Sequence, residues 1–344
     1  MSAAFALVLA GFSNGSDAYD FNDSHFHLTN YIQEGISLPD FLKIMGDRTG
    51  RAAVFGIPVQ QKWDAFESGS RAPDYYLLSD AELYYYSFTD AIIADQYLHL
   101  PAQDRKRFDP MITGFNPTDM YAADHVRRVL LMYPGVFSGI GEFSVHKEFV
   151  SSKVAGHTAS LLNPALDKLL TFAGEAGLVV ILHNDINTVR PAPGRPAHFD
   201  DLKTVFRAHQ TTSIIWAHTG LGRFVKPTAD HVDLLREMLG SDEFSHVNLD
   251  ISWDEVAKWI VADDATLDTW VKLIKQYPER FLFGSDAVAP KSQADYLRAF
   301  DVYQKLWDRL DAQTAGKVKA KNFERIFDAA RSKVRVWEAG HIQK

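Results

Sequence analysis

Six histidines and carboxylates stand at the C-terminal ends of apolar segments that are far apart along the chain. They are His25, His27, Glu142, His183, His218 and Asp286. Residues two apart on a strand point to the same face, so His25 and His27 can both reach one ion. A His-x-His pair or a buried histidine taken alone is more often structural. Ionisable groups rarely end long apolar strands in this number unless they are paired or liganded, so we predict a shared metal site.

The chain has no cysteine, which excludes thiolate ligands and disulfides. Any metal must therefore be held by His, Asp and Glu side chains. Neutral imidazoles combined with carboxylates suit Zn²⁺ best, while Mn²⁺, Fe²⁺ and Ni²⁺ also bind such donors. The predicted cofactor is a divalent metal, foremost Zn²⁺, as one or two ions.

The segments that carry these residues alternate with helical segments about eight times. The predicted strands are 19–26, 51–58, 110–115, 136–143, 178–183, 213–218, 246–251 and 280–286. The predicted helices begin at Ser37, at Ser79 (a capping-box spacing, running to Leu98), at Thr118 and after Asn163, and two more cover 293–310 and 319–330. Eight strand–helix units predict an α/β fold, a (β/α)₈ TIM barrel of parallel strands with an N-terminal extension and a helical insertion. An open doubly wound sheet is the rival, and the absence of a Gly-x-Gly-x-x-Gly turn counts against it.

The whole chain, residues 1–344, is predicted to be a single barrel domain, because it shows no internal repeat, low-complexity tract or linker. Its length exceeds the ~250 residues of a typical barrel, which insertions explain. The aromatic segment 75–97 is longer than a barrel helix needs. Ordinary helix packing is the expected explanation, and a lid or a subunit contact in a homo-oligomer are the alternatives.

Residues 1–18 form either a strand or cap packed on the barrel or a truncated export signal. No Lys or Arg precedes the apolar run 3–12, and this run is far shorter than the ~20 residues that span a bilayer. We therefore expect no membrane span and a cytoplasmic location, with a periplasmic one as the alternative. The net charge of -8 argues against a broad nucleic-acid-binding face, which leaves a small molecule as the expected substrate.

The order His-x-His, Glu, His, His, Asp on successive strands resembles the amidohydrolase superfamily over nearly the whole chain. The motifs are DSHFHL, GIGEF, VILHND, IIWAHTG and FLFGSDA. The segments IIWAHTGLGR and RFLFGSDA are most similar to the branch of small-acid hydrolases, lactonases and nonoxidative decarboxylases. GIGEF instead resembles the Glu-bearing TatD-like branch.

This resemblance implies roles for the six residues. His25 and His27 would bind the metal with His183 and Asp286. Glu142 would either bridge two ions or support the ligands from behind. His218 would either ligate a second ion or touch the substrate as an electrophile or proton carrier. Asp286 would act as the catalytic base that takes a proton from water and returns it to the leaving group.

Further polar residues follow the same strands and are candidates for substrate binding: Lys147, Arg190, Arg223 and Trp253. Arg190, Arg195 and Arg223 could each hold a carboxylate or phosphate by a two-pronged contact, although each alone is more often a surface residue. Asp250, within the seventh predicted strand, would either orient a ligating histidine or touch the substrate.

The leading functional hypothesis is hydrolysis of an amide, lactone or other ester by metal-activated water. Nonoxidative decarboxylation of a small carboxylic acid comes second, and a bridging Glu142 would favour hydrolysis over it. Phosphoester hydrolysis is third. The non-enzyme alternative is a barrel that binds a metal or ligand without turnover, and the presence of every expected ligand together with Asp286 argues against it.

Overall fold

The computed structural model describes residues 19–30, 34–57, 61–63, 69, 87–152 and 159–342. The predicted N-terminal extension at 1–18 and the capping box that begins at Ser79 lie outside these residues. Of the aromatic segment 75–97, only the part from residue 87 onward is described.

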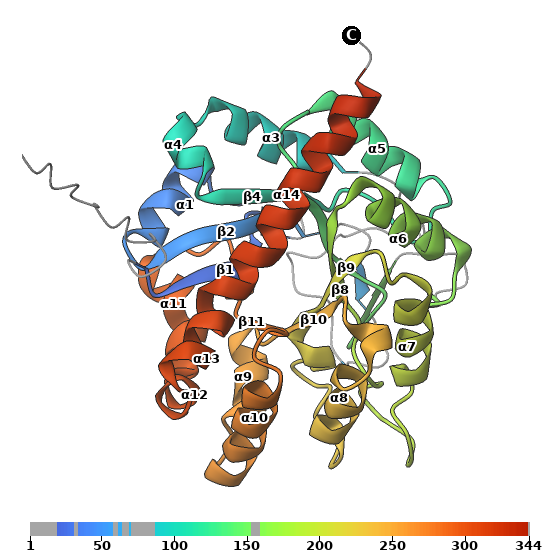
Figure 1. Ribbon diagram of the computed structural model, residues 1–344, viewed down its shortest axis with the longest axis vertical. Coiled ribbons are helices and arrows are strands. Elements are labelled where there is room, and N and C mark those ends of the chain that lie inside the picture. Colours follow the sequence, from blue (N-terminus) through green and yellow to red (C-terminus); the bar gives the residue numbers. More distant parts are fainter. Residues whose placement is uncertain are drawn as a thin grey trace, which may run out of the picture.

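The strands form a ring of parallel neighbours (Figure 1). In sheet order they are β11 (Phe281–Leu282), β10 (Val247–Asp250), β9 (Ser213–Trp216), β8 (Val179–His183), β5 (Gly139–Ser144), β4 (Phe108–Ile112), β2 (Thr49–Phe55), β1 (Phe21–His27) and β12 (Ala287–Val288). β11 pairs with β10 while β12 pairs with β1, so two halves of the eighth strand close the ring. The predicted (β/α)₈ fold is confirmed.

Helices surround this ring and connect its strands. They are α1 (Leu38–Met45), α3 (Thr89–His99), α4 (Ala102–Arg105), α5 (Ala122–Met132), α6 (Pro164–Ala176), α7 (Phe199–Ala208), α8 (His231–Leu239), α9 (Asp254–Ile260), α10 (Asp264–Gln276), α11 (Gln293–Val302), α12 (Gln304–Arg309), α13 (Ala312–Gly316) and α14 (Asn322–His341). The predicted helix 293–310 is divided at Tyr303, and the helix predicted over 319–330 runs on to His341.

Two helix starts predicted from the sequence have the expected caps. The Ser37 side chain accepts a hydrogen bond from the Asp40 backbone N–H, and the Asn163 side chain accepts one from the Leu166 N–H. In each helix a proline follows within the first turn, where its missing N–H costs nothing. These caps fix the residues at which the two helices begin.

In two of the predicted strands, the difference from the observed bounds concerns the candidate site. β9 ends at Trp216, so His218 lies in the short turn η2 (Ala217–Gly220) instead of on the strand. The eighth strand is interrupted between β11 and β12, and Asp286 lies in the interruption. His218 has φ 57° and Asp286 has φ 50°, and an extended strand cannot contain this left-handed backbone.

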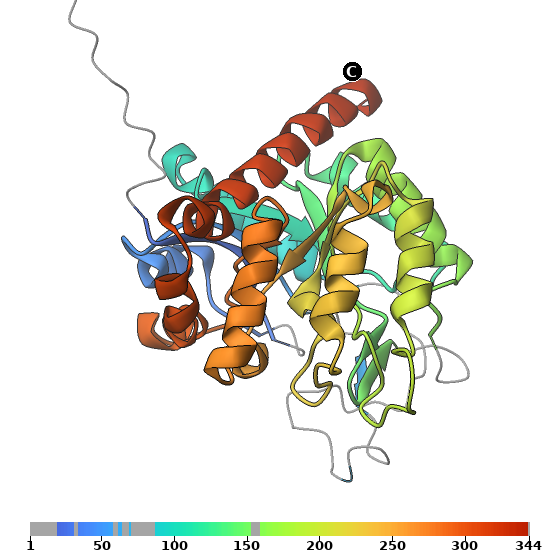
Figure 2. The same cartoon turned by 60° about the horizontal axis from the view of Figure 1, so that its bottom comes forward.

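A second, three-stranded antiparallel sheet was not predicted. It consists of β3 (Gln61–Trp63), β7 (Val150–Ser152) and β6 (His146–Lys147). β3 belongs to the loop after β2, while β6 and β7 belong to the loop after β5, so this sheet links the two loops. Figure 2 shows it at the end of the barrel opposite α14. This end is the C-terminal end of the strands, where barrel enzymes carry their sites.

The C-terminal helix α14 covers the other end of the barrel. It crosses the strands diagonally in Figure 1, and Asn322 donates hydrogen bonds to the carbonyls of Pro278 and Phe281 at the start of the eighth strand. Phe323, Ile326 and Phe327 from this helix join one buried cluster with side chains from inside the barrel, such as Phe55. The helix therefore closes the barrel interior from its N-terminal side.

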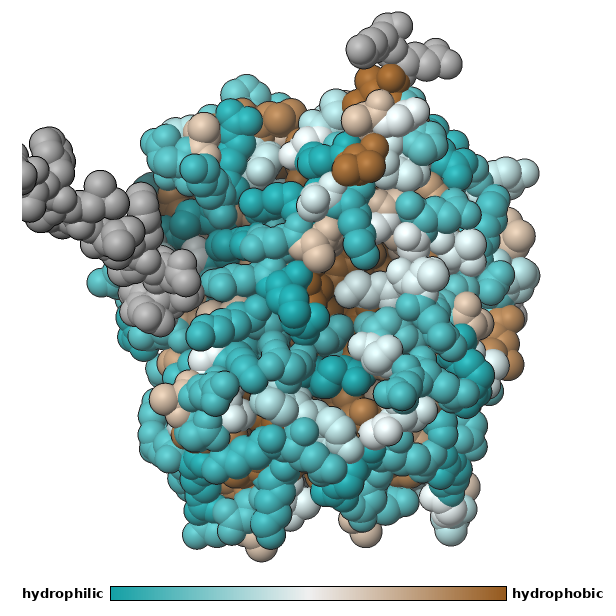
Figure 3. Space-filling view, viewed as in Figure 1, coloured by the Kyte–Doolittle hydropathy of each residue, from teal (hydrophilic) through white to brown (hydrophobic). Residues whose placement is uncertain are grey.

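The surface around α14 is mostly hydrophilic, with apolar side chains scattered over it (Figure 3). Within the described part of the chain, no helix combines the length and the apolar character that crossing a bilayer requires.

The packing of α14 predicts a large loss of stability on truncation of Phe327, which is fully buried and stacks on Phe323. We expect Phe327→Ala to lower the free energy of unfolding by about 3–5 kcal/mol, because it leaves a cavity under the helix. Val336→Ala, at an exposed position of the same helix, is the control and should stay within about 0.5 kcal/mol. Denaturant titration measures both, and equal effects would show that α14 does not seal the barrel.

Candidate metal centre

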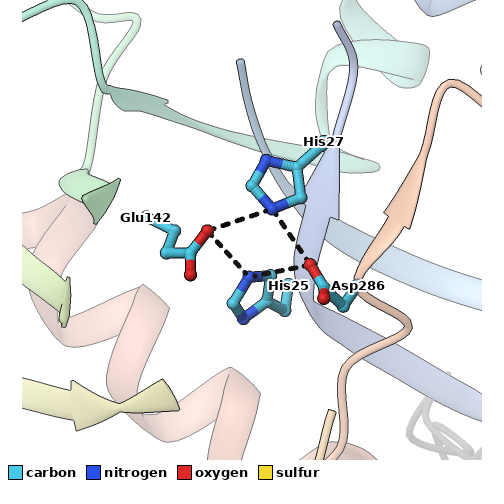
Figure 4. Close-up of side chains that lie close together, drawn as sticks. All are labelled: His25, His27, Glu142 and Asp286. Carbon is cyan, nitrogen blue, oxygen red and sulfur yellow. Dashed lines mark ion pairs between the residues drawn. The ribbon is translucent and has the colours of Figure 1, made fainter. Parts of the chain in front are cut away.

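The structure brings all six predicted ligands together in two overlapping groups, and a third group joins His25 and His218 to Asp250. The first contains His25, His27, Glu142 and Asp286, whose ligand atoms lie within 4.8 Å of one another (Figure 4). The second contains Glu142, His183 and His218 within the same limit. Glu142 belongs to both groups. Five of these side chains are buried, and Asp286 is partly buried at the edge.

His25 and His27 each turn the same ring atom, Nε2, toward the first group. The Nδ1 of His27 lies 3.0 Å from the carbonyl oxygen of Gly56, which can only accept, so this nitrogen carries the proton. The Nδ1 of His25 lies 3.0 Å from Asp250 Oδ2 in the same way. A neutral imidazole that donates from Nδ1 offers its Nε2 lone pair to a metal. The structure thus places Asp250 against His25, one of the predicted metal ligands. This contact fits the first of the two predicted roles for Asp250, which is to orient a ligating histidine.

The two carboxylate oxygens of Glu142 face different histidines. Its Oε2 lies 3.3 Å from His27 Nε2 and 3.8 Å from His25 Nε2. Its Oε1 contacts His183 Nδ1 and lies 3.7 Å from His218 Nε2. This strand position requires the preceding glycine, because a Cβ on Gly141 would lie 2.4 Å from the Ile181 carbonyl oxygen.

Three buried atoms of the site lack a hydrogen-bond partner among the described residues: His25 Nε2, Glu142 Oε2 and His218 Nε2. Leaving a buried polar atom without a partner costs free energy comparable to a lost hydrogen bond. Nitrogen lone pairs and carboxylate oxygens that converge on one space are the donors that divalent metals bind. The residues present therefore fit a metal ion.

The charges of the cluster reinforce one another. Burial alone would raise the pKa of Glu142, but the nearby charges of Lys147 and His183 hold this pKa well below its ordinary value. Burial alone would lower the pKa of His25, but the charges of Asp286 and Asp250 hold it well above 6.5. Ionised carboxylates that draw protons onto neighbouring histidines also attract a metal cation, which competes with those protons.

Left-handed backbone is concentrated at this site. Besides His218 and Asp286, Trp253 has φ 77°. Such conformations cost non-glycine residues about 1–3 kcal/mol and persist where the surroundings enforce them, which is typical of functional sites. Here the Asp286 N–H still bonds the His25 carbonyl oxygen at 2.8 Å, so the eighth strand stays attached to the first.

A cavity of about 400 Å³ opens beside the cluster. Of the six predicted ligands, Asp286 is the one that lines it, together with Trp253 and Arg223. The Asp286 Oδ1 also lies 3.0 Å from His27 Nε2 and 3.3 Å from His25 Nε2. Asp286 therefore stands between the buried ligands and the space open to a small molecule.

Three of the four predicted substrate-binding residues lie beside this cluster. The Lys147 Nζ is 3.7 Å from Glu142 Oε1 and 5.9 Å from the centre of the Trp253 ring. The Arg223 guanidinium lies 5.4 Å from the same ring, which is 5.3 Å from the His218 ring. Arg190 lies at an exposed position of the loop after β8 and does not line the cavity.

Two polar residues without a predicted role contact the histidines of the cluster directly. The Ser252 hydroxyl lies 2.7 Å from His218 Nδ1, and Asp185 Oδ1 lies 3.2 Å from His183 Nε2. Each stands two positions after a residue already singled out, Asp250 and His183. That spacing is the signal that could have identified them.

Comparison with known proteins gives a family match and similar folds. A family model described as Amidohydrolase matches residues 23–329. The fold is similar to a putative 2-pyrone-4,6-dicarboxylic acid hydrolase from Pseudomonas putida (15% identity, 90% of this chain and 98% of that chain covered, TM-score 0.53). It is also similar to an amidohydrolase from Burkholderia multivorans (14%, 90% and 99%, 0.54) and to a TIM-barrel protein from Bordetella bronchiseptica (11%, 90% and 99%, 0.54). No functionally characterised protein matched the sequence significantly. At these identities the structural likeness shows a shared fold.

The pKa shifts of the histidines predict how the stability of the metal-free protein depends on pH. The pKa values of His25, His27 and His183 are raised above 6.5. The folded chain therefore binds these protons more tightly than the unfolded chain, and their contribution is complete below pH 6.5 and lost as the pH rises through the folded-state pKa values. We expect the melting temperature of metal-free protein to fall as the pH rises above 6.5.

Metal-loaded protein is the control for this measurement. A bound cation replaces the protons, so its melting temperature should change less over the same range. A melting temperature of the metal-free protein that stays constant or rises above pH 6.5 would contradict the charge arrangement described for the cluster.

Proposed function

The chain belongs to the amidohydrolase family, and on this basis we propose that it is a metal-dependent hydrolase that cleaves an amide, lactone or other ester bond of a small molecule. The observation that carries the proposal is the buried cluster of His25, His27, Glu142 and Asp286 beside a cavity that Asp286 lines. We propose that His25, His27 and Asp286 hold one divalent ion, with Zn²⁺ as the foremost candidate.

Glu142 is proposed as a bridge between this ion and a second one held by His183 and His218. The support is its position in both groups, with one carboxylate oxygen turned to each pair of histidines. Two-ion sites stabilise both the attacking and the leaving oxygen of a displacement, which favours hydrolysis over decarboxylation.

When bound, a divalent metal acts as a Lewis acid on a carbonyl oxygen and makes water reactive near neutral pH. The protein supplies the proton transfer. Asp286 accepts the proton of the attacking water on its carboxylate and delivers it to the leaving group. The carboxylate is ionised and therefore free of a proton before the first step: burial raises its pKa, but His25, His27 and His218 outweigh burial and hold this pKa below its ordinary value.

Lys147, Trp253 and Arg223 are proposed to bind the substrate. Two cations flank one indole ring next to His218. This arrangement fits a substrate that turns an anionic group toward the two cations. Arg223 also pairs with Glu255 at 3.3 Å, which fixes the direction of its side chain. Arg190 is not part of this proposal, because it does not line the cavity.

Asp286→Asn tests the proposed base. Against a panel of lactones, esters, dipeptides and aromatic acids, we expect wild-type protein to release acid and alcohol or amine from one substrate class. Asp286→Asn should lower that turnover by about 10²- to 10⁴-fold, because the amide cannot accept the proton. Metal content, measured by elemental analysis, should remain, because the Asn side chain keeps an oxygen that can bind the ion beside His25 and His27.

Asp295→Asn is the matched control, since Asp295 lines the same cavity but is exposed and lies outside both ligand groups. It should keep near-normal turnover. Full turnover in Asp286→Asn would rule out the proposed base, and release of CO₂ without hydrolysis products would assign the protein to the decarboxylases.

Replacing Glu142 tests the second ion. We expect elemental analysis of reconstituted wild-type protein to give about two ions per chain, as in two-metal hydrolases. Glu142→Gln should give about one, because the neutral amide cannot bridge two cations. Glu338→Gln, a buried glutamate on α14 far from the site, is the control and should keep the wild-type ratio. A ratio of one in the wild type would remove the bridging role from Glu142.

A further inference from the structure

Asp250 carries more hydrogen bonds than its single contact with His25 requires. Its Oδ2 accepts the proton of His25 Nδ1 at 3.0 Å. Its Oδ1 accepts the backbone N–H of His218 at 2.7 Å and that of Ser252 at 3.2 Å, and it also contacts the Ser252 hydroxyl. One fully buried carboxylate is thus attached to a histidine of each ligand group, and Ser252 stands between it and His218.

The hydroxyl of Ser252 has one proton, and this fixes which partner donates in its hydrogen bonds with Asp250 and His218. A carboxylate oxygen can only accept, so the single hydroxyl proton of Ser252 points to Asp250 Oδ1. The Ser252 oxygen lies 2.7 Å from His218 Nδ1, and having given away its proton it can only accept there. The proton in this contact therefore belongs to His218 Nδ1. The more distant contact of the same oxygen with His25 Nδ1, at 3.4 Å, does not compete, because that nitrogen already donates to Asp250.

We propose that Ser252 is a positioning residue that sets the tautomer of His218, with the proton on Nδ1 and the lone pair of Nε2 directed at the metal centre. This inference rests on the proposed metal-dependent function. It adds the reason why His218, in the group with Glu142 and His183, presents a lone pair to a cation. The Nε2 of His218 is one of the buried atoms without a hydrogen-bond partner among the described residues. It lies 3.7 Å from Glu142 Oε1 and 3.9 Å from Asp286 Oδ2.

His218 was predicted either to ligate a second ion or to act on the substrate as an electrophile or proton carrier, and the position of its proton favours the first role. A neutral imidazole protonated on Nδ1 has no proton on Nε2, so it ligates a cation and does not donate a hydrogen bond to the substrate. Hydrogen bonds link His218 through Ser252 to Asp250, and link Asp250 to His25. A single carboxylate therefore keeps one histidine of each group protonated on Nδ1, with Nε2 turned toward the proposed ions. The left-handed backbone at His218 fits this scheme, because its N–H turns inward to Asp250.

The test compares Ser252→Ala with Ser252→Thr, which keeps the hydroxyl. In metal-free, histidine-labelled protein, nitrogen NMR distinguishes the two neutral tautomers, and His218→Gln identifies the His218 signals. We expect wild type and Ser252→Thr to show His218 protonated on Nδ1, and Ser252→Ala to show a mixture. Titration with Zn²⁺ should show a 10- to 100-fold weaker second site in Ser252→Ala, the usual effect of removing a partner behind a ligand.

Ser24→Ala is the matched control. Ser24 is equally buried beside His25, but its hydroxyl donates to the Phe283 carbonyl oxygen at 2.9 Å and contacts no ligand. It should change neither the tautomer nor the second-site affinity. An unchanged His218 tautomer in Ser252→Ala, or a loss of affinity no larger than in Ser24→Ala, would overturn the proposal. Both readouts are made without substrate, so they do not depend on whether the hydrolase proposal survives.

Discussion

Negative charge held inside the barrel is the constraint on which the rest of the site depends. Glu142 and Asp250 are buried, and Asp286 is nearly so. Removing a carboxylate from water costs several kcal/mol unless positive charge and hydrogen bonds compensate for it. In this protein the compensation comes from histidines that point their ring nitrogens at the carboxylates, and a cation that displaces their protons meets lone pairs already turned toward it.

The backbone around the cluster is arranged to keep these directions. Asp23, two residues before His25, accepts hydrogen bonds from the His25 N–H, from the Ser285 N–H at 2.8 Å and from the Tyr296 hydroxyl at 2.9 Å. It therefore ties the first strand to the segment that carries Asp286. Gly284 allows this approach, since a Cβ there would lie 2.5 Å from the Cβ of His25. Ligands from opposite ends of the chain are held together by the closing strand of the barrel.

The two ends of the barrel have different tasks. At the N-terminal end, α14 packs apolar side chains such as Phe327 into the barrel interior and seals it. At the C-terminal end, loops and the small sheet place Lys147 and Trp253 near the ligands. Stability and chemistry are therefore separated in space, which is why substitutions at the two ends should differ in their effects on unfolding and on metal binding.

The sequence by itself determined the strand order and the ligand types, because buried parallel strands are apolar and a histidine or carboxylate at their ends stands out. His25, His27 and Asp286 could be predicted for this reason. Only the tertiary structure decided that His218 leaves its strand, that Arg190 does not line the cavity and that Ser252 contacts His218. Hydrogen-bond directions depend on the relative positions of distant segments, and residue types along one chain do not contain that information. The predicted His25–His27 pair became part of a cluster able to hold a metal only when folding set Asp250 behind one ring and the Gly56 carbonyl behind the other.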